Sequence, residues 1–301
     1  SMAPYPHASK AFIGQRANNR YIAEVLAVLG VAALSLGSLV QAYREGEDPT
    51  EYDSPKNAEY RFCSEVIEKK HINELQSKGF VVIDGVLDNQ SLKEATNYCQ
   101  NFIQRHSFGS YDEDVRQDRV VWVVDENRDK TGRKPGTAAI HNTGLLHAFR
   151  IVQGAAQEIQ RHSNEEHTNF NVPLRAQLAQ YQKGGGYLAH RDSCNESFFD
   201  LGLLNWLSLA QYRRRRYTAI LYLNDTSAVD QRWNKKRDGG CLRVYVDADP
   251  ADDDGASSNE IIDIEPVGGR LILFDSRSVL HQVMPSHRER LAITVWIEDA
   301  F

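Results

Sequence analysis

The chain contains little cysteine, and its few cysteines are widely spaced. Among 301 residues there are four: Cys63, Cys99, Cys194 and Cys241. They form no CxxC pair, so their spacing indicates neither a zinc site nor a disulfide framework. A reducing, intracellular compartment is therefore favoured, and any metal site has to draw on other ligands.

An excess of basic charge is also absent. The chain has 35 Lys and Arg residues against 41 Asp and Glu, which gives a net charge of −6 at pH 7. A mildly acidic chain lacks the field that attracts nucleic acid nonspecifically, so we expect no nucleic-acid partner. The apolar fraction of 41% and the charged fraction of 25% are typical of a soluble globular protein.

Long hydrophobic runs are limited to one segment near the N-terminus. Residues 25–43, VLAVLGVAALSLGSLVQAY, carry no charge, but 19 residues are near the lower limit of the ~20 that cross a bilayer. Basic residues precede the segment and acidic residues follow it, so a span would place the rest of the chain on the non-cytoplasmic side. Its serines, glycines and Gln41 fit a packed helix equally well. Two hypotheses stay open: an intracellular soluble protein of cytoplasm or nucleus, which we favour, and a single-pass membrane anchor in the secretory pathway.

The chain divides into an N-terminal extension and one compact domain. Residues 1–56 hold the hydrophobic segment and a polar linker, and residues 57–301 form the predicted domain. Apolar residues at helical spacing predict helices over 71–78, from 88 or 89 onward, and over 144–162. Strands are predicted over 80–83, 120–124, 177–182, 217–223, 241–246, 261–264, 270–274 and 291–297. The pattern indicates an α+β fold with a mainly β core, a sandwich or barrel, supported by N-terminal helices.

Two histidines and one carboxylate form the most informative pattern in the chain. His190 and Asp192 are separated by one residue, so on an extended backbone their side chains point to the same side. His281 lies far downstream and has to come from another strand. Two histidines and a carboxylate on one side of a metal leave positions open, which is the ligand set of non-haem Fe(II) oxygenases. We therefore predict that His190, Asp192 and His281 hold Fe(II), with O₂ entering an open position.

An arginine strengthens this prediction, since an HxD pair alone is common. Arg290 begins the alternating strand RLAITVWI, in which Leu291, Ile293 and Val295 face one way and Arg290 faces the other. A guanidinium in line with pocket-facing residues needs a partner. A bidentate carboxylate is the natural one, so the arginine indicates an acidic cosubstrate.

Several segments make the pattern more specific. The HxD…H set followed by Arg290 resembles the 2-oxoglutarate- and Fe(II)-dependent oxygenases, and within them the prolyl 4-hydroxylases of the type that acts on hypoxia-inducible factor. Four segments carry the closer resemblance: GYLAHRD (186–192), RRYTAILYLN (215–224), GGCLR (239–243) and RQDRVVW (116–122). The second follows the form R-x-x-T-x-x-Y-Y-L-N, with Leu221 in place of the first tyrosine. The resemblance covers the chain from about Ile72 to the C-terminus.

This resemblance implies a double-stranded β-helix, or jelly roll, and a set of residue roles. His190, Asp192 and His281 would hold the iron, and no catalytic residue beyond these ligands is implied. The 2-oxoglutarate pocket would be formed by Arg290, Tyr222, Tyr181, Leu242, Thr294 and Trp296. Arg290 would pair with the distal carboxylate, and Tyr222 would donate a hydrogen bond to it. Substrate binding would involve Arg116, Asp118 and Arg215, of which Asp118 and Arg215 match family positions that pair with each other.

The resemblance further implies a dioxygenase that hydroxylates prolyl residues of a protein or peptide. Fe(II), 2-oxoglutarate and O₂ would be required, ascorbate would support turnover, and succinate and CO₂ would be co-products. One alternative is hydroxylation of a non-prolyl residue or a small molecule; another is a non-catalytic peptide-binding module. Extra stretches at 197–212 and around 249–259 depart from the family, so its protein target does not carry over. The acidic run 247–254 is interpreted as a solvated loop. The oligomeric state stays open.

Overall fold

The computed structural model describes residues 66–106, 115–125, 137–163, 169–193, 210–224, 232–249 and 254–300. The hydrophobic segment 25–43, the linker and the expected domain start at residue 57 lie outside these ranges. So do most of the 197–212 insertion and residues 250–253 of the acidic loop. No helix in the described part of the chain is long and apolar enough to cross a membrane.

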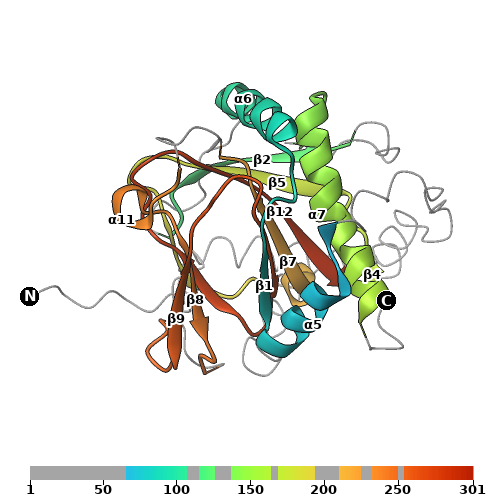
Figure 1. Ribbon diagram of the computed structural model, residues 1–301, viewed down its shortest axis with the longest axis vertical. Helices are drawn as coiled ribbons and strands as arrows, with labels where there is room; N and C mark the ends of the chain where they lie inside the picture. Colours follow the sequence, from blue (N-terminus) through green and yellow to red (C-terminus); the bar gives the residue numbers. More distant parts are fainter. Residues whose placement is uncertain are drawn as a thin grey trace, which may run out of the picture. The chain divides into compact units, whose positions relative to one another are not determined.

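Three longer helices and a series of short strands make up the described part of the chain (Figure 1). The helices are α5 (Lys69–Lys78), α6 (Asn89–His106), α7 (Thr143–His162), α10 (Ala210–Arg213) and α11 (Lys235–Asp238). The first strands are β1 (Phe80–Ile83), β2 (Asp118–Val124), β3 (Thr137–Ala139), β4 (Phe170–Asn171), β5 (Arg175–Tyr181) and β6 (Tyr187–His190). The remaining strands are β7 (Arg215–Tyr222), β8 (Leu242–Val246), β9 (Glu260–Ile264), β10 (Leu271–Asp275), β11 (Leu280–Val283) and β12 (Arg290–Asp299).

The strands form two sheets. The larger has the order β1-β10-β7-β12-β5-β2-β3, with β4 added beside β12, and the smaller has the order β6-β11-β8-β9. From β5 to β12 the chain passes repeatedly between the sheets, because β5, β7, β10 and β12 belong to the larger and β6, β8, β9 and β11 to the smaller. The expected α+β organisation with a β core is confirmed, and each predicted helix and strand is present with ends that shift by a few residues.

Helices α6 and α7 cover the outer face of the larger sheet (Figure 1). Their starts follow from capping: Asp88 accepts a hydrogen bond from the backbone of Ser91, and Asn142 accepts one from the backbone of Leu145. The alternation predicted for β12 is confirmed, since Leu291 and its odd-numbered neighbours join the core under the helices. Each such aliphatic side chain contributes about 1.5–3 kcal/mol when fully buried. A second apolar cluster lies between the two sheets, and it surrounds the candidate site.

Two strands that carry predicted metal ligands were given no range by the sequence pattern, although His281 was expected to lie on a strand. β6 and β11 are four residues long, and each includes a histidine. Their burial does not alternate strictly, so the sequence lacks the period-two signal that reveals a half-buried strand. Pairing with neighbouring strands, which is a tertiary effect, defines both.

Candidate metal centre

The smaller sheet places the two predicted histidine ligands side by side. β6 and β11 are antiparallel neighbours, and His190 stands directly opposite His281 in their register. Asp192 lies just past the end of β6 and turns back toward both rings. Its Oδ1 lies 3.5 Å from His190 Nε2, and its Oδ2 lies 3.9 Å from His281 Nε2. The candidate ligand atoms of the three residues lie within 4.8 Å of one another, as binding to one small cation requires.

Backbone carbonyls orient both imidazole rings. His190 Nδ1 lies 2.7 Å from the carbonyl oxygen of Leu188, and His281 Nδ1 lies 3.2 Å from that of Val279. A carbonyl can only accept, so each Nδ1 carries the proton and donates it. Each Nε2 then presents a lone pair toward Asp192. An outer hydrogen bond of this kind is what usually holds a metal-binding histidine in place.

His281 and Asp192 are in the charge states that a metal requires. Burial, together with the neighbouring charge of His190, lowers the pKa of His281 to about 4, so its imidazole is neutral at pH 7. Burial alone would raise the pKa of Asp192, but its histidine neighbours and Arg215 hold that pKa well below the ordinary range. A neutral imidazole and an ionised carboxylate are ready to bind a cation without first losing protons.

Arg290 is a buried cation on the inner face of the larger sheet. Its side chain is 2% exposed, and its Nη2 donates to the Tyr222 hydroxyl at 3.1 Å. The guanidinium lies about 5 Å from the ring centroids of Tyr181 and Tyr222, at 5.0 and 4.9 Å. Its Nε has no hydrogen-bond partner, and no carboxylate in the described ranges forms an ion pair with it. A buried guanidinium in this state suits a carboxylate ligand such as the distal end of 2-oxoglutarate.

Tyr181, Thr294 and Trp296 lie on the same sheet as Arg290, and Leu242 lies on the smaller sheet. Tyr181 stands opposite Arg290 in the β5–β12 register, and Leu242 belongs to the apolar cluster between the sheets. Thr294 is 9% exposed and lies farther along β12. Beyond it, Trp296 keeps a buried Nε1 without a hydrogen-bond partner. The fold therefore places Tyr181 and Tyr222 beside Arg290, and it sets Thr294 and Trp296 toward the other end of β12.

The predicted substrate-binding residues form a different pair from the one expected. Arg116 binds both oxygens of Asp118 at 2.6 Å and also donates to Gln177 at 2.5 Å. Arg215 instead donates to the backbone oxygen of Asp192 at 3.2 Å and stacks 4.1 Å over Trp296. The expected pairing of Asp118 with Arg215 is therefore not formed. The reason is local, because Arg116 lies two residues before Asp118 and reaches its carboxylate in a fork.

One residue of the HxD segment ties the metal ligands to the acidic loop. Arg191 lies between His190 and Asp192, and its side chain binds the carbonyl oxygens of Ser278, Ala248 and Asp249. The start of the acidic loop is thereby held beside the candidate metal ligands. A cavity of about 860 Å³ lies elsewhere, between α5 and the β8–β9 hairpin, and its lining includes none of the predicted site residues.

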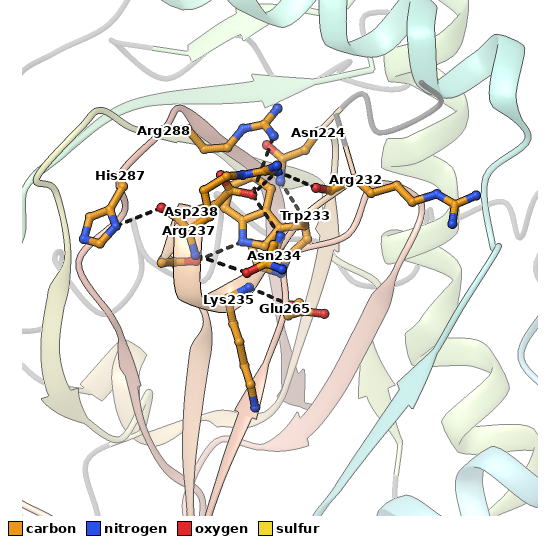
Figure 2. Close-up of polar contacts among 12 residues, drawn as sticks. Asn224, Arg232, Trp233, Asn234, Lys235, Arg237, Asp238, Glu265, His287 and Arg288 are labelled. Atoms are coloured by element: carbon orange, nitrogen blue, oxygen red, sulfur yellow. Dashed lines mark hydrogen bonds and ion pairs between the residues drawn. The ribbon is translucent and has the colours of Figure 1, made fainter. Parts of the chain in front are cut away.

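A polar network around α11 supports the segment that leads into Arg290, and the sequence analysis missed it. Figure 2 shows His287 and Arg288 beside this short helix. The backbone N–H of His287 donates to the carbonyl of Asp238 at 2.7 Å, and Arg288 lies 4.9 Å over the ring of Trp233. On the other side, Asn224 accepts from the backbone N–H of Leu291 at 2.8 Å. The start of β12 is thus held at two points, through hydrogen bonds that carry no periodic sequence signal.

Replacing Asp238 tests this support. Its carboxylate accepts a fork from Arg237 and a bond from the Asn234 backbone, and it is 5% exposed. We expect Asp238→Ala to lower the free energy of unfolding by about 1.5–3 kcal/mol, because hydrogen bonds to a charged, buried carboxylate are lost. Thermal melting measures this, with the exposed Lys236→Ala as the matched control. Equal melting temperatures for the two variants would contradict the assigned support.

Comparison with known proteins gives a consistent result. Residues 176–298 match the sequence model of the 2OG-Fe(II) oxygenase superfamily. Human Egl nine homolog 1 is 29% identical over 191 residues, which are 62% of this chain and 34% of that protein. Human prolyl hydroxylase EGLN3 is 32% identical over 189 residues, which are 62% of this chain and 60% of that protein. The chain thus matches only part of the length of these relatives.

Solved structures agree on the fold. A prolyl hydroxylase from Trichoplax adhaerens, in complex with a hypoxia-inducible factor peptide fragment, aligns with a TM-score of 0.55 at 22% identity. The alignment covers 84% of this chain and 96% of that one. A prolyl-4-hydroxylase from Pseudomonas putida aligns with a TM-score of 0.52 at 22% identity, over 77% and 99% of the two chains. The double-stranded β-helix of these enzymes is therefore the fold of this chain. The β core over residues 176–298 thus matches the 2OG-Fe(II) oxygenase superfamily, whose cofactors are Fe(II) and 2-oxoglutarate, and the chain is a distant homologue of the Egl nine prolyl hydroxylases.

Proposed function

We propose that this protein hydroxylates prolyl residues of a protein or peptide. The observation that carries the oxygenase part is the convergence of His190, Asp192 and His281, together with the buried cation Arg290. The prolyl part is supported by curated relatives named as prolyl hydroxylases at 28–32% identity. A relative of the same fold that was solved with a peptide supports a peptide substrate.

The residues of the chain would have the following roles in this reaction. His190, Asp192 and His281 would bind Fe(II) on one side and leave the opposite side open. Arg290 and Tyr222 would hold the distal carboxylate of 2-oxoglutarate, and the apolar surroundings would exclude water and strengthen that ion pair. Tyr181, Leu242, Thr294 and Trp296 would line the cosubstrate. When bound, iron and 2-oxoglutarate supply the oxidation by O₂, in which one oxygen atom enters the prolyl C–H bond and the other enters succinate, with release of CO₂.

The substrate would lie against the segment that carries Arg116 and Asp118. Arg116 lies 5.1 Å over the ring of Tyr187, which itself stacks on the ring of His190 at 3.8 Å. This contact joins the segment to the metal side of the pocket. Arg215 and Trp296 lie near the carboxylate ligand and complete the candidate surface.

The direct test is incubation with Fe(II), 2-oxoglutarate, ascorbate and a library of proline-containing peptides. We expect a mass gain of one oxygen atom on proline, with succinate formed in equal amount, and neither in the His281→Ala protein. Succinate formed only with non-proline substrates would favour hydroxylation of another residue or a small molecule. Peptide binding without Fe(II) binding would favour the non-catalytic module.

A conservative change at Arg116 tests the substrate surface. Lysine keeps the charge but loses the fork that holds Asp118. We expect Arg116→Lys to lower kcat/KM for the peptide by about tenfold, roughly 1.4 kcal/mol, and to leave the Kd of 2-oxoglutarate unchanged. Steady-state kinetics with varied peptide, beside titration of 2-oxoglutarate, separates these effects. A loss of 2-oxoglutarate affinity with unchanged peptide kinetics would place Arg116 in the cosubstrate pocket instead.

A further inference from the structure

The second oxygen of the Asp192 carboxylate is held by a buried hydroxyl from the opposite sheet. Thr218 Oγ1 donates to Asp192 Oδ2 at 2.7 Å, and Thr218 is fully buried in the middle of β7. In register, Thr218 stands between Phe274 of β10 and Trp296 of β12. The larger sheet therefore holds Asp192, which lies just after β6 of the smaller sheet.

A second hydroxyl continues this contact. Ser276 Oγ lies 2.7 Å from Thr218 Oγ1, and Ser276 is also fully buried. Two backbone hydrogen bonds fix Ser276. Its N–H donates to the carbonyl oxygen of Arg216 at 3.0 Å, and its carbonyl accepts from the N–H of Ser193 at 2.9 Å. The last of these bonds links Ser276 back to the residue that follows Asp192.

The direction of the hydrogen bonds follows from proton counting. Thr218 Oγ1 donates to Asp192 Oδ2, so the single hydroxyl proton of Thr218 points at that oxygen. Ser276 must then donate its own proton to Thr218 Oγ1. The result is a one-way chain from Ser276 through Thr218 to Asp192, in which each bond polarises the next.

We propose that Thr218 is a positioning residue for the metal ligand Asp192, with Ser276 fixing its hydroxyl. The hydrogen bond holds Oδ2 and thereby orients the carboxylate, so that Oδ1 stays on the side of His190 Nε2. The inference rests on the proposed function, since it assumes that the three residues bind the iron. Outer partners of this kind typically change metal affinity by about 10- to 100-fold when they are removed.

The experiment measures Mn(II) binding by the electron paramagnetic resonance signal of the free ion, without 2-oxoglutarate or substrate. Thr218→Val keeps the shape and removes the hydroxyl, and we expect the Kd for Mn(II) to rise by about 10- to 100-fold. Thr218→Ser restores the hydroxyl and is expected to bind within about threefold of the unmodified protein, a difference below one factor of ten in Kd.

A double variant separates positioning from folding. Thr218→Val leaves the Ser276 hydroxyl without its acceptor, so its melting temperature falls; adding Ser276→Ala removes both polar groups and is expected to restore much of that loss. If Thr218 positions Asp192, the double variant melts higher and still binds Mn(II) weakly. The inference is overturned if the double variant regains Mn(II) affinity together with its melting temperature. It is also overturned if Thr218→Val binds Mn(II) as tightly as the unmodified protein does. Mn(II) binding by the unmodified protein that is no tighter than that of His281→Ala would instead refute the metal centre itself.

Discussion

The Asp192→Ala protein is expected to lose hydroxylation by at least about 1,000-fold, roughly 4 kcal/mol. Asp192 is the only carboxylate among the three candidate ligands, and it lies within 4 Å of both imidazole Nε2 atoms. Without it two neutral nitrogens remain, and the site loses both a ligand and the attraction between carboxylate and cation. Isothermal titration with Fe(II) under anaerobic conditions should show no binding at concentrations that saturate the unmodified protein.

A histidine outside the site provides the control. His147 lies on α7 and contacts Ser91 on α6, in the helical layer. His147→Ala should bind Fe(II) and turn over as the unmodified protein does. Retained iron binding in Asp192→Ala, or equal losses in both variants, would show that the converging side chains are not the metal centre.

Replacement of Arg290 by methionine is expected to weaken 2-oxoglutarate binding by roughly 30-fold to several-thousand-fold. That range corresponds to the 2–5 kcal/mol lost when one partner of a buried ion pair is removed. The affinity of Arg290→Lys for 2-oxoglutarate should lie between those of Arg290→Met and the unmodified protein, because lysine keeps the charge but cannot form a fork with a carboxylate. Titration of 2-oxoglutarate into the protein loaded with Mn(II) gives the affinities directly.

Thermal stability supplies an independent readout of the same residue. A buried cation without a carboxylate partner is costly, so the Arg290→Met protein alone should melt at or above the temperature of the unmodified protein. Saturating 2-oxoglutarate should raise the melting temperature of the unmodified protein, because a ligand that binds only the native state stabilises it. The same addition should leave Arg290→Met unchanged. A similar shift in both would place the cosubstrate carboxylate elsewhere.

The strands that carry strong periodicity were predictable, and those that carry the metal ligands were not. β12 alternates over the segment RLAITVWI, so its inward face and the burial of Arg290 follow from the sequence. β6 and β11 are four residues long, and only their pairing with each other and with β8 defines them. A motif spacing could name His190, Asp192 and His281 as a set, but it could not give the 4.8 Å span of their ligand atoms.

Hydrogen bonds between the two sheets also could not be predicted from the sequence. Thr218 is the threonine of the R-x-x-T motif, but nothing in that motif indicates that its hydroxyl reaches Asp192 on the other side of the sandwich. The pairing of Asp118 was misjudged for a related reason. Which arginine reaches its carboxylate depends on side-chain geometry, and Arg116 forms the fork.

The sequence by itself determined the class of fold, the order of its elements, the identity of the candidate ligands and the need of Arg290 for an anion. These depend on residue type, period and the cost of burying charge, all of which are local or additive properties. Only the tertiary structure decided the partners. The register between β6 and β11, the hydroxyl chain behind Asp192 and the α11 network before Arg290 all join residues distant in sequence. Such contacts depend on how two sheets pack, and no pattern within one segment encodes them.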